Sequence, residues 1–163
     1  MTTKKPAKTV TAPLNSTAVS GVSNGKNPYA LYEIDKTAEV QKGVPFKRGE
    51  FSIFVKRAGG GNKAYTKCLA ETLAPVRQQL ADDTLPESEG DNLMAQVFAD
   101  TIIVGWENVR DRKGKPLAYT RENVVMMLTD LPELFRELQA FASNLANFRK
   151  AAIEADSKNS VKS

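Results

Sequence analysis

The sequence predicts a mainly α-helical protein, a small bundle of about four helices with a short N-terminal β-hairpin and disordered termini. Two patterns predict this class. Apolar residues recur at helical spacing through most of the chain after residue 62, whereas strict alternation of apolar and polar residues occurs only within 43–58. At 163 residues, 41% apolar and 26% charged, the chain has the size and composition of one soluble domain.

Both ends of the chain have few large apolar side chains. Residues 1–28 and 156–163 therefore cannot bury enough apolar area to offset about 1–2 kcal/mol of backbone entropy per residue. We expect a disordered basic tail over 1–28, a single helical domain with an N-terminal hairpin over 29–155, and a disordered tail over 156–163.

The net charge of +4 belongs to the N-terminal tail. Residues 1–28 contain four lysines and no acid, so 23 basic residues less four leave 19, against 19 acidic residues. The predicted folded part is therefore neutral, and its basic residues lack the interleaved aromatic side chains of a nucleic-acid surface. We expect no nucleic-acid binding by the folded part.

The hairpin is the one predicted β element. Val44 and Phe46 precede a charged turn over 47–50, and Phe51, Ile53 and Val55 follow it in alternation with other residues. Because a lone two-stranded hairpin is marginal in water, it must pack on the helices.

Four helices are predicted after the glycines at 59–61. The first runs over 63–80, capped by Asn62, broken or kinked at Pro75, with Cys68 on its buried face. The second runs from about 91 to Trp106 and has a wide apolar face, which makes it the expected central helix. A short third helix covers 121–129, and a fourth, the longest, begins at Pro132.

The fourth predicted helix carries a seam of large apolar residues spaced four, three, four and three apart. This two-heptad spacing is typical of a helix that packs on another helix. The seam can complete the protein's own core or bind a partner chain, and the sequence leaves both open. Its members, the candidate partner-binding residues, are Leu134, Leu138, Phe141, Leu145 and Phe148.

The sequence offers little to catalysis or to metal binding. It has no histidine, and no serine or cysteine stands in a nucleophile-elbow context. The glycine-rich stretch 57–63 lacks the Gly-Lys-Ser/Thr ending of a P-loop, and the acidic loop 81–91 lacks the spacing of an EF-hand. We therefore expect a protein that is not an enzyme and has no cofactor and no metal.

Two further features of the sequence indicate the cellular compartment of the protein. One cysteine cannot form an internal disulfide, which favours a reducing compartment. No apolar run approaches the roughly 20 residues that span a bilayer, and the N-terminus lacks the apolar segment of a signal peptide. We expect a cytosolic protein that contacts no membrane.

The stretch 105–123, GWENVRDRKGKPLAYTREN, is the most distinctive part of the chain. The residue pattern predicts the end of one helix, a glycine and proline turn, and a threonine-capped helix start. The residues that define the motif are Gly105, Trp106, Glu107, Gly114, Pro116, Thr120, Glu122 and Asn123.

This stretch resembles the tail assembly chaperones of long-tailed bacteriophages (siphophages), which share its Gly-Trp-Glu, its charged turn and its Thr and Glu-Asn before a helix. Two further blocks are similar in the same order: FSIFVKRAGGGNKAYTKCLAETLAP before it and TDLPELFRELQAFASNLANFR after it. The three blocks lie between residues 51 and 149, and the resemblance is taken to cover roughly residues 29–150.

The resemblance implies a non-enzymatic assembly factor in the host bacterial cytoplasm. Its expected partners are the tape measure protein, which it holds soluble, and the major tail protein, which it helps to recruit; self-association is also possible for such a protein. Physically, this role needs weak apolar contacts to a helical client, for which the seam is the expected surface. The alternative is a structural virion component, either a tail tube or a head-tail connector protein, and a third class is a nucleic-acid-binding accessory protein that uses the basic tail.

Overall fold

The computed structural model describes residues 27–160, so the tail predictions for 1–26 and 161–163 lie outside the described residues. Within that range there are seven α-helices, three strands, one π-helical turn and two 3₁₀ turns. The helices are α1 (Pro28–Tyr32), α2 (Lys63–Leu73), α3 (Arg77–Ala81), α4 (Glu87–Thr101), α5 (Arg121–Asp130), α6 (Pro132–Ser143) and α7 (Lys150–Ser160). The strands are β1 (Val44–Arg48), β2 (Phe51–Val55) and β3 (Ile103–Glu107), and the turns are Ala38–Lys42, Ala74–Val76 and Leu145–Phe148. The fold is mainly α with a small sheet, as the sequence predicts.

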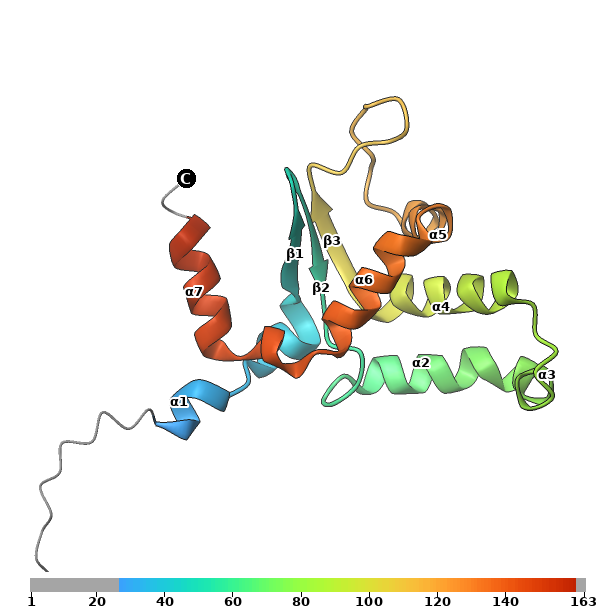
Figure 1. Ribbon diagram of the computed structural model, residues 1–163, viewed down its shortest axis with the longest axis horizontal. Helices are drawn as coiled ribbons and strands as arrows, with labels where there is room; N and C mark the ends of the chain where they lie inside the picture. The colour runs from blue at the N-terminus through green and yellow to red at the C-terminus, as the bar shows by residue number, and fades with distance from the viewer. Residues whose placement is uncertain (1–26, 161–163) are drawn as a thin grey trace, which may run out of the picture.

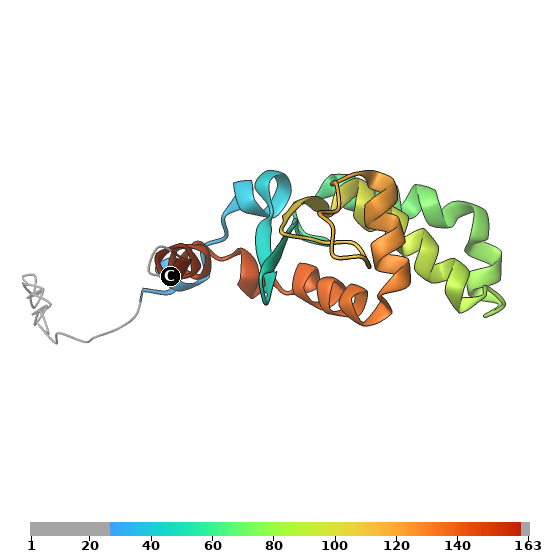
Figure 2. The ribbon, with the colours of Figure 1, turned by 90° about the horizontal axis from the view of Figure 1, so that it is seen from above.

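The molecule is elongated, with the sheet near its middle (Figures 1 and 2). α2 and α4 extend from the sheet toward one end, where α3 connects them, and α5 packs on α4. α6 passes beside the sheet, and α1 and α7 lie together at the opposite end. Both ends of the described chain are therefore on the side away from α3.

The predicted hairpin is confirmed. β1 and β2 pair antiparallel, with Phe46 opposite Ile53 and Val44 opposite Val55, and Gly49 takes a positive φ of 55° in the turn between them. Opposed residues share a face of the sheet, so the alternating apolar side chains all reach the buried side. Phe46, Ile53 and Val55 are almost completely buried.

A third strand corrects the prediction of a helix reaching Trp106. α4 ends at Thr101, and β3 pairs antiparallel with β2, which places Trp106 opposite Ile53. The stretch from Ile102 to Val104 is β-branched, and such residues favour a strand when a pleated partner is available. The block 105–123 is therefore a strand, a loop and a helix start, and its first element is not helical.

The predicted break at Pro75 is confirmed, because a 3₁₀ turn separates α2 from α3 at this residue. Asn62 caps α2 as predicted, accepting a hydrogen bond at its side-chain oxygen from the backbone N–H of Tyr65 at 3.3 Å. Cys68 was expected to be buried, but it is only half-buried, with its Sγ 3.9 Å from the hydroxyl of Thr72. α2 lies at the side of the molecule and has no fully buried residue.

The fourth predicted helix is three elements in the structure. α6 begins at Pro132 as predicted but ends at Ser143, because Asn144 is extended and its side chain caps the following turn. α7 then continues to Ser160, so residues 156–160 are helical where the sequence predicted a disordered tail. α4, with 15 residues, is the longest described helix.

Two apolar clusters hold the described residues together. The larger joins the sheet to α4, α5 and α6, and its fully buried members include Ile53, Phe98 and Leu138. Phe98 makes edge-to-face contacts with Phe135 at 5.2 Å and with Tyr65 at 6.3 Å between ring centroids. The smaller cluster consists of Ala38, Val44 and Phe148, with Ile34, Phe141 and Ile153 packed on it. α4 is thus the central helix, as predicted.

Candidate functional site

The loop between β3 and α5 is built from its own hydrogen bonds. Asp111 accepts from the backbone N–H groups of Lys113 and Lys115, both at 2.8 Å, and Gly114 between them has a positive φ of 76°. Arg110 and Pro116 form an isolated antiparallel bridge. The predicted turn is therefore a small hairpin-like loop, and Gly114 and Pro116 shape its backbone.

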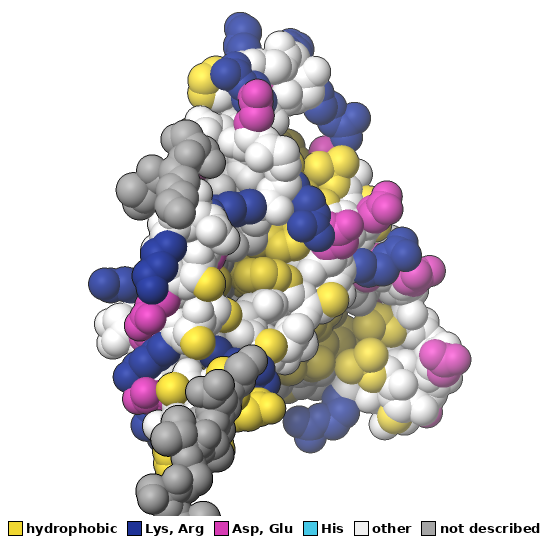
Figure 3. All heavy atoms as spheres, turned by 60° about the vertical axis from the view of Figure 1, so that its left-hand side comes forward, with side chains coloured by type: hydrophobic (Ala, Val, Ile, Leu, Met, Phe, Trp, Pro, Cys, Tyr) yellow, Lys and Arg dark blue, Asp and Glu magenta, His cyan; other side chains and the backbone are white. Residues whose placement is uncertain are grey.

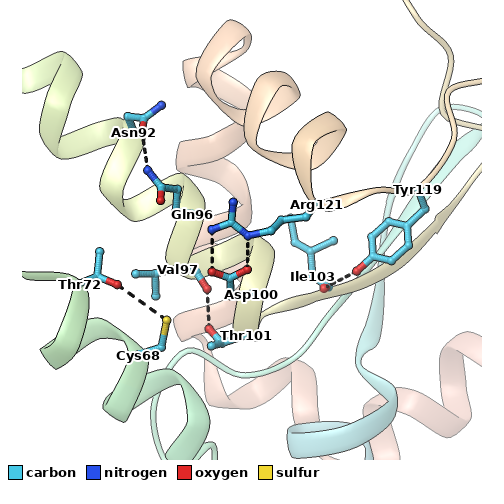
Figure 4. A network of polar contacts seen from close by, with 10 residues as sticks. All are labelled: Cys68, Thr72, Asn92, Gln96, Val97, Asp100, Thr101, Ile103, Tyr119 and Arg121. Carbon is cyan, nitrogen blue, oxygen red and sulfur yellow. Dashed lines mark hydrogen bonds and ion pairs between the residues drawn. The ribbon is translucent and has the colours of Figure 1, made fainter.

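The aromatic residues of the same block lock this loop to the sheet. The indole N–H of Trp106 donates to the Leu117 carbonyl at 2.9 Å, and its ring meets Tyr119 edge to face at 5.3 Å. The Tyr119 hydroxyl donates to the Ile103 carbonyl at 2.8 Å, and burial raises the pKa of this phenol (Figure 4). Trp106 is thus a packing residue.

The start of α5 is fixed to the end of α4. The Thr120 hydroxyl accepts from the N–H of Asn123 at 3.2 Å, which confirms the predicted cap. Arg121 binds both carboxylate oxygens of Asp100, at 2.6 and 2.9 Å (Figure 4). This hydrogen bonding and the charge of Asp100 raise the pKa of Arg121.

The remaining motif residues take no part in a shared cavity. Gly105 and Glu107 are in β3, and Glu122 is in the first turn of α5, where its charge favours the helix N-terminus. The Asn123 amide donates to the Ala118 carbonyl at 2.9 Å. These four residues therefore serve the structure of the joint between β3 and α5.

The glycine-rich loop after β2 closes around a carboxylate of the protein itself. Glu39 is 6% exposed and accepts from Arg57 at 2.6 Å and from the backbone N–H of Gly61 at 3.3 Å. The amide of buried Asn62 donates to the carbonyls of Arg57 and Thr101. Because Glu39 takes the N–H that a phosphate would need, this loop is a structural connection, as its sequence predicted.

The structure divides the predicted seam. Leu138 and Phe148 are fully buried, in the larger and the smaller cluster respectively. Leu134 and Phe141 are half-buried, and Leu145, 39% exposed, lies in the turn after α6. The five residues form no continuous surface. Leu134 lines a pocket beside Arg48 and Glu137, and Phe141 lines a separate groove beside β1 and α7.

This groove, which we call the β1–α7 groove, has a volume of about 240 Å³. It lies on the side of the molecule shown in Figure 3, where hydrophobic side chains gather in a hollow. β1, Phe141 at the end of α6 and one face of α7 enclose it. Its lining residues are Val44, Pro45, Lys47, Phe141, Asn147, Ala152, Ile153, Asp156 and Ser157.

The walls of the groove are apolar and its rim is polar. Phe141 is held edge to face against Phe46 at 5.3 Å between ring centroids, and Ile153 of α7 packs on the smaller cluster. An ion pair of 2.9 Å between Lys47 and Asp156 joins β1 to α7. Such a groove can take apolar side chains and offers no constellation for bond-making chemistry.

β1 is an edge strand of the sheet, but it is poorly suited to pairing with another strand. The sheet order is β1-β2-β3, and Pro45 is the second residue of β1. Proline has no backbone N–H to donate, so it blunts a sheet edge. The groove therefore favours the side chains of a helix over the backbone of an added strand.

Sequence reasoning did not identify the α7 side of the groove. Asp156 and Ser157 lie in the segment that the sequence predicts to be a tail, and no sequence pattern marks Ile153 as a site residue. The one available signal was Ile153 itself, a large apolar residue isolated among alanines and polar residues after Phe148. Such an isolated residue indicates a docking contact only once the chain is known to fold back on β1.

Two other features are absent from residues 27–160. No three His, Cys, Asp or Glu side chains between residues 27 and 160 are grouped as metal ligands would be. No helix in that range is both long enough and apolar enough to cross a membrane.

A comparison with protein families matches residues 60–159 to the family described as YdaY prophage protein. No curated protein and no solved structure matches the chain. The family match covers more than half of the chain, from the glycine-rich loop through α7. The protein is therefore phage-derived, and the chain belongs to the YdaY prophage protein family.

Proposed function

We propose that this protein is a phage tail assembly chaperone that binds a helical segment of the tape measure protein in the β1–α7 groove. It then helps to recruit the major tail protein, and it acts in the host bacterial cytoplasm by binding rather than by catalysis. The observation that carries the proposal is the apolar groove beside Phe141, found in a phage-derived chain whose three sequence blocks resemble those chaperones.

The dimensions of the groove suit a client that must later be released. Its volume of about 240 Å³ accommodates a few apolar side chains. Burial of each large side chain contributes about 1.5–3 kcal/mol before the costs of association, so a single groove binds weakly. A helix that lays its apolar face in such a groove is a recurrent mode of peptide recognition.

The binding site differs from the one expected on the sequence. A partner cannot contact Leu138 or Phe148 while the core is intact, because both are fully buried. Of the predicted seam, Phe141 is retained in the proposal, joined by Ile153 and Ala152 of α7. Ala152 is exposed and lines the groove, which makes it the position of choice for a test.

Co-expression of the full chain with the tape measure protein of the same genome tests the proposal. The intact chain should keep the tape measure protein soluble and co-purify with it. Ala152→Glu should prevent co-purification, since it places a charge in the groove without changing the core. Ala151→Glu is the matched control, because Ala151 is an exposed neighbour on α7 that does not line the groove.

Two results would contradict different parts of the proposal. If the intact chain neither solubilises nor retains the tape measure protein, the chaperone role is wrong. If Ala152→Glu binds as well as the intact chain, the groove is not the binding site. Mass spectrometry of purified particles provides the separate test against a structural virion component, which would be present in stoichiometric amount.

A further inference from the structure

A second groove lies between the β3–α5 loop and α5, and we call it the methionine groove. Leu117, Met126, Met127 and Leu131 form its apolar surface, and its volume is about 290 Å³. Met126 and Leu131 are each 48% exposed. Methionine side chains are flexible and polarizable, so such a surface adapts readily to a partner.

The rim of the methionine groove has a small excess of positive charge, because Arg110, Arg112 and Lys113 line it together with Asp111 and Asp130. The loop from Arg110 to Lys115 carries four basic residues and one acid, Asp111. Arg112 pairs with Asp130 at 2.9 Å, but its side chain is 81% exposed. A partner with acidic residues flanking apolar ones would suit this site. Its acids would face the basic side chains of the rim, and its apolar side chains would enter the apolar groove.

The chain itself has a segment in which acidic residues flank apolar ones. It forms the tip of the molecule, made of α3 and the start of α4. Residues 80–91 contain five acids and no basic residue, together with Leu80 and Leu85. Leu80 is 46% exposed, and every acid in the segment is exposed. The tip is therefore an apolar patch surrounded by negative charge.

The tip of one molecule is far from its own methionine groove. α4 leads from the tip toward the sheet, and its 15 residues span about 20 Å before β3 begins. Figure 1 shows α3 at one end of the molecule and the β3–α5 loop projecting from another side. The complementary surfaces can thus meet only between two molecules.

We propose that the methionine groove binds the acidic tip, residues 80–91, of a second copy of this chain. The contact joins two different surfaces, so it is heterologous and leaves one groove and one tip unfilled on every pair. Copies therefore add head to tail. This self-association does not depend on the chaperone role.

Sedimentation velocity of the full chain over a range of concentrations tests the proposal. The mean mass should rise with concentration and exceed that of a dimer. High salt should weaken the association, because ionic screening reduces the attraction between tip and rim. A chain that remains monomeric at low salt and millimolar concentration would overturn the proposal.

Two double variants make the test specific. Lys113→Gln with Met126→Gln alters the groove, and Glu87→Gln with Glu89→Gln alters the tip. Each should raise the dissociation constant at least about tenfold, the equivalent of about 1.4 kcal/mol. All four positions are exposed, so the fold should persist, as circular dichroism can verify. Lys158→Gln on α7 is a matched control and should associate like the intact chain.

Mixing the two double variants gives the decisive result. One retains a native tip and the other a native groove, so an equimolar mixture should form dimers and nothing larger. Absence of association in the mixture, or unchanged association of either variant alone, would overturn the proposal.

Discussion

The helices that pack on the two sides of the sheet are held there by different interactions. On one side, α4, α5 and α6 pack on the sheet through fully buried apolar side chains such as Phe98 and Leu138. On the other side, α7 and α1 form a clasp, held by Ile153, the ion pairs Lys47–Asp156 and Lys150–Glu33, and a backbone bridge between Ile34 and Arg149. Exposed ion pairs contribute little, so the clasp should open at a lower free energy than the core.

This difference bears on function because the β1–α7 groove lies at the clasp. If the proposed chaperone role holds, movement of α7 would admit or release the client there while the larger cluster stays intact.

The largest expected loss of stability comes from a substitution in the larger apolar cluster. Leu138→Ala should lower the free energy of unfolding by about 2–5 kcal/mol, because it leaves a cavity at a fully buried site. Leu145→Ala, at the partly exposed seam position, should change it by only about 0.5 kcal/mol. Urea unfolding of both variants provides the measurement, and equal losses would show that α6 and the turn after it are equally part of the core.

The buried ion pair between Glu39 and Arg57 should show the next largest effect. Glu39→Gln removes the negative charge that faces a guanidinium whose Nε has no hydrogen-bond partner. We expect a loss of about 1–3 kcal/mol in the free energy of unfolding. Glu50→Gln, in the exposed turn of the hairpin, is the control; a similar loss there would point to net charge as the cause.

A substitution in the clasp should change the stability of α7 alone. Ile153→Ala should reduce the protection of α7 from hydrogen exchange and leave that of α4 unchanged, because Ile153 is half-buried and packs only on the smaller cluster. Hydrogen exchange with mass spectrometry resolves the two helices. Loss of protection in both would mean that clasp and core unfold together.

The smallest effect is expected from Lys150→Met, which removes the ion pair with Glu33. The hydrogen bond to Glu33 and its charge raise the pKa of Lys150 above the ordinary 10.5. The stabilisation is therefore complete below pH 10.5 and is lost as the pH rises through the raised pKa. The difference in melting temperature between pH 7 and pH 11 should be smaller for the variant than for the intact chain. Equal differences would show that the ion pair contributes nothing in solution.

Local chemistry accounts for the predictions that the structure confirms. Asn62 and Thr120 are helix caps, Pro75 and Pro132 interrupt or begin helices, and Gly49 serves the hairpin turn. Each of these depends on a residue and its immediate neighbours. None needs knowledge of distant contacts.

The incorrect predictions at β3 and α7 involve distant partners, whereas the end of α6 is set locally by the extended Asn144 and its cap. The apolar run at 102–106 has no decisive period, and its strand conformation depends on pairing with β2 about 50 residues earlier. The seam spacing continued past Asn144, although the helix ends there. For α7, propensity alone did not indicate a helix to Ser160 that docks against β1.

The sequence by itself determined the fold class, the hairpin, the starts of α2, α5 and α6, and the absence of histidine, because these depend on local propensity and composition. Only the tertiary structure decided that Trp106 lies in a third strand, that Leu138 and Phe148 are buried, and that Phe141 lines a groove closed by α7. The reason is physical: burial and groove formation depend on which distant segments pack together, and side-chain spacing along one helix does not specify its partner.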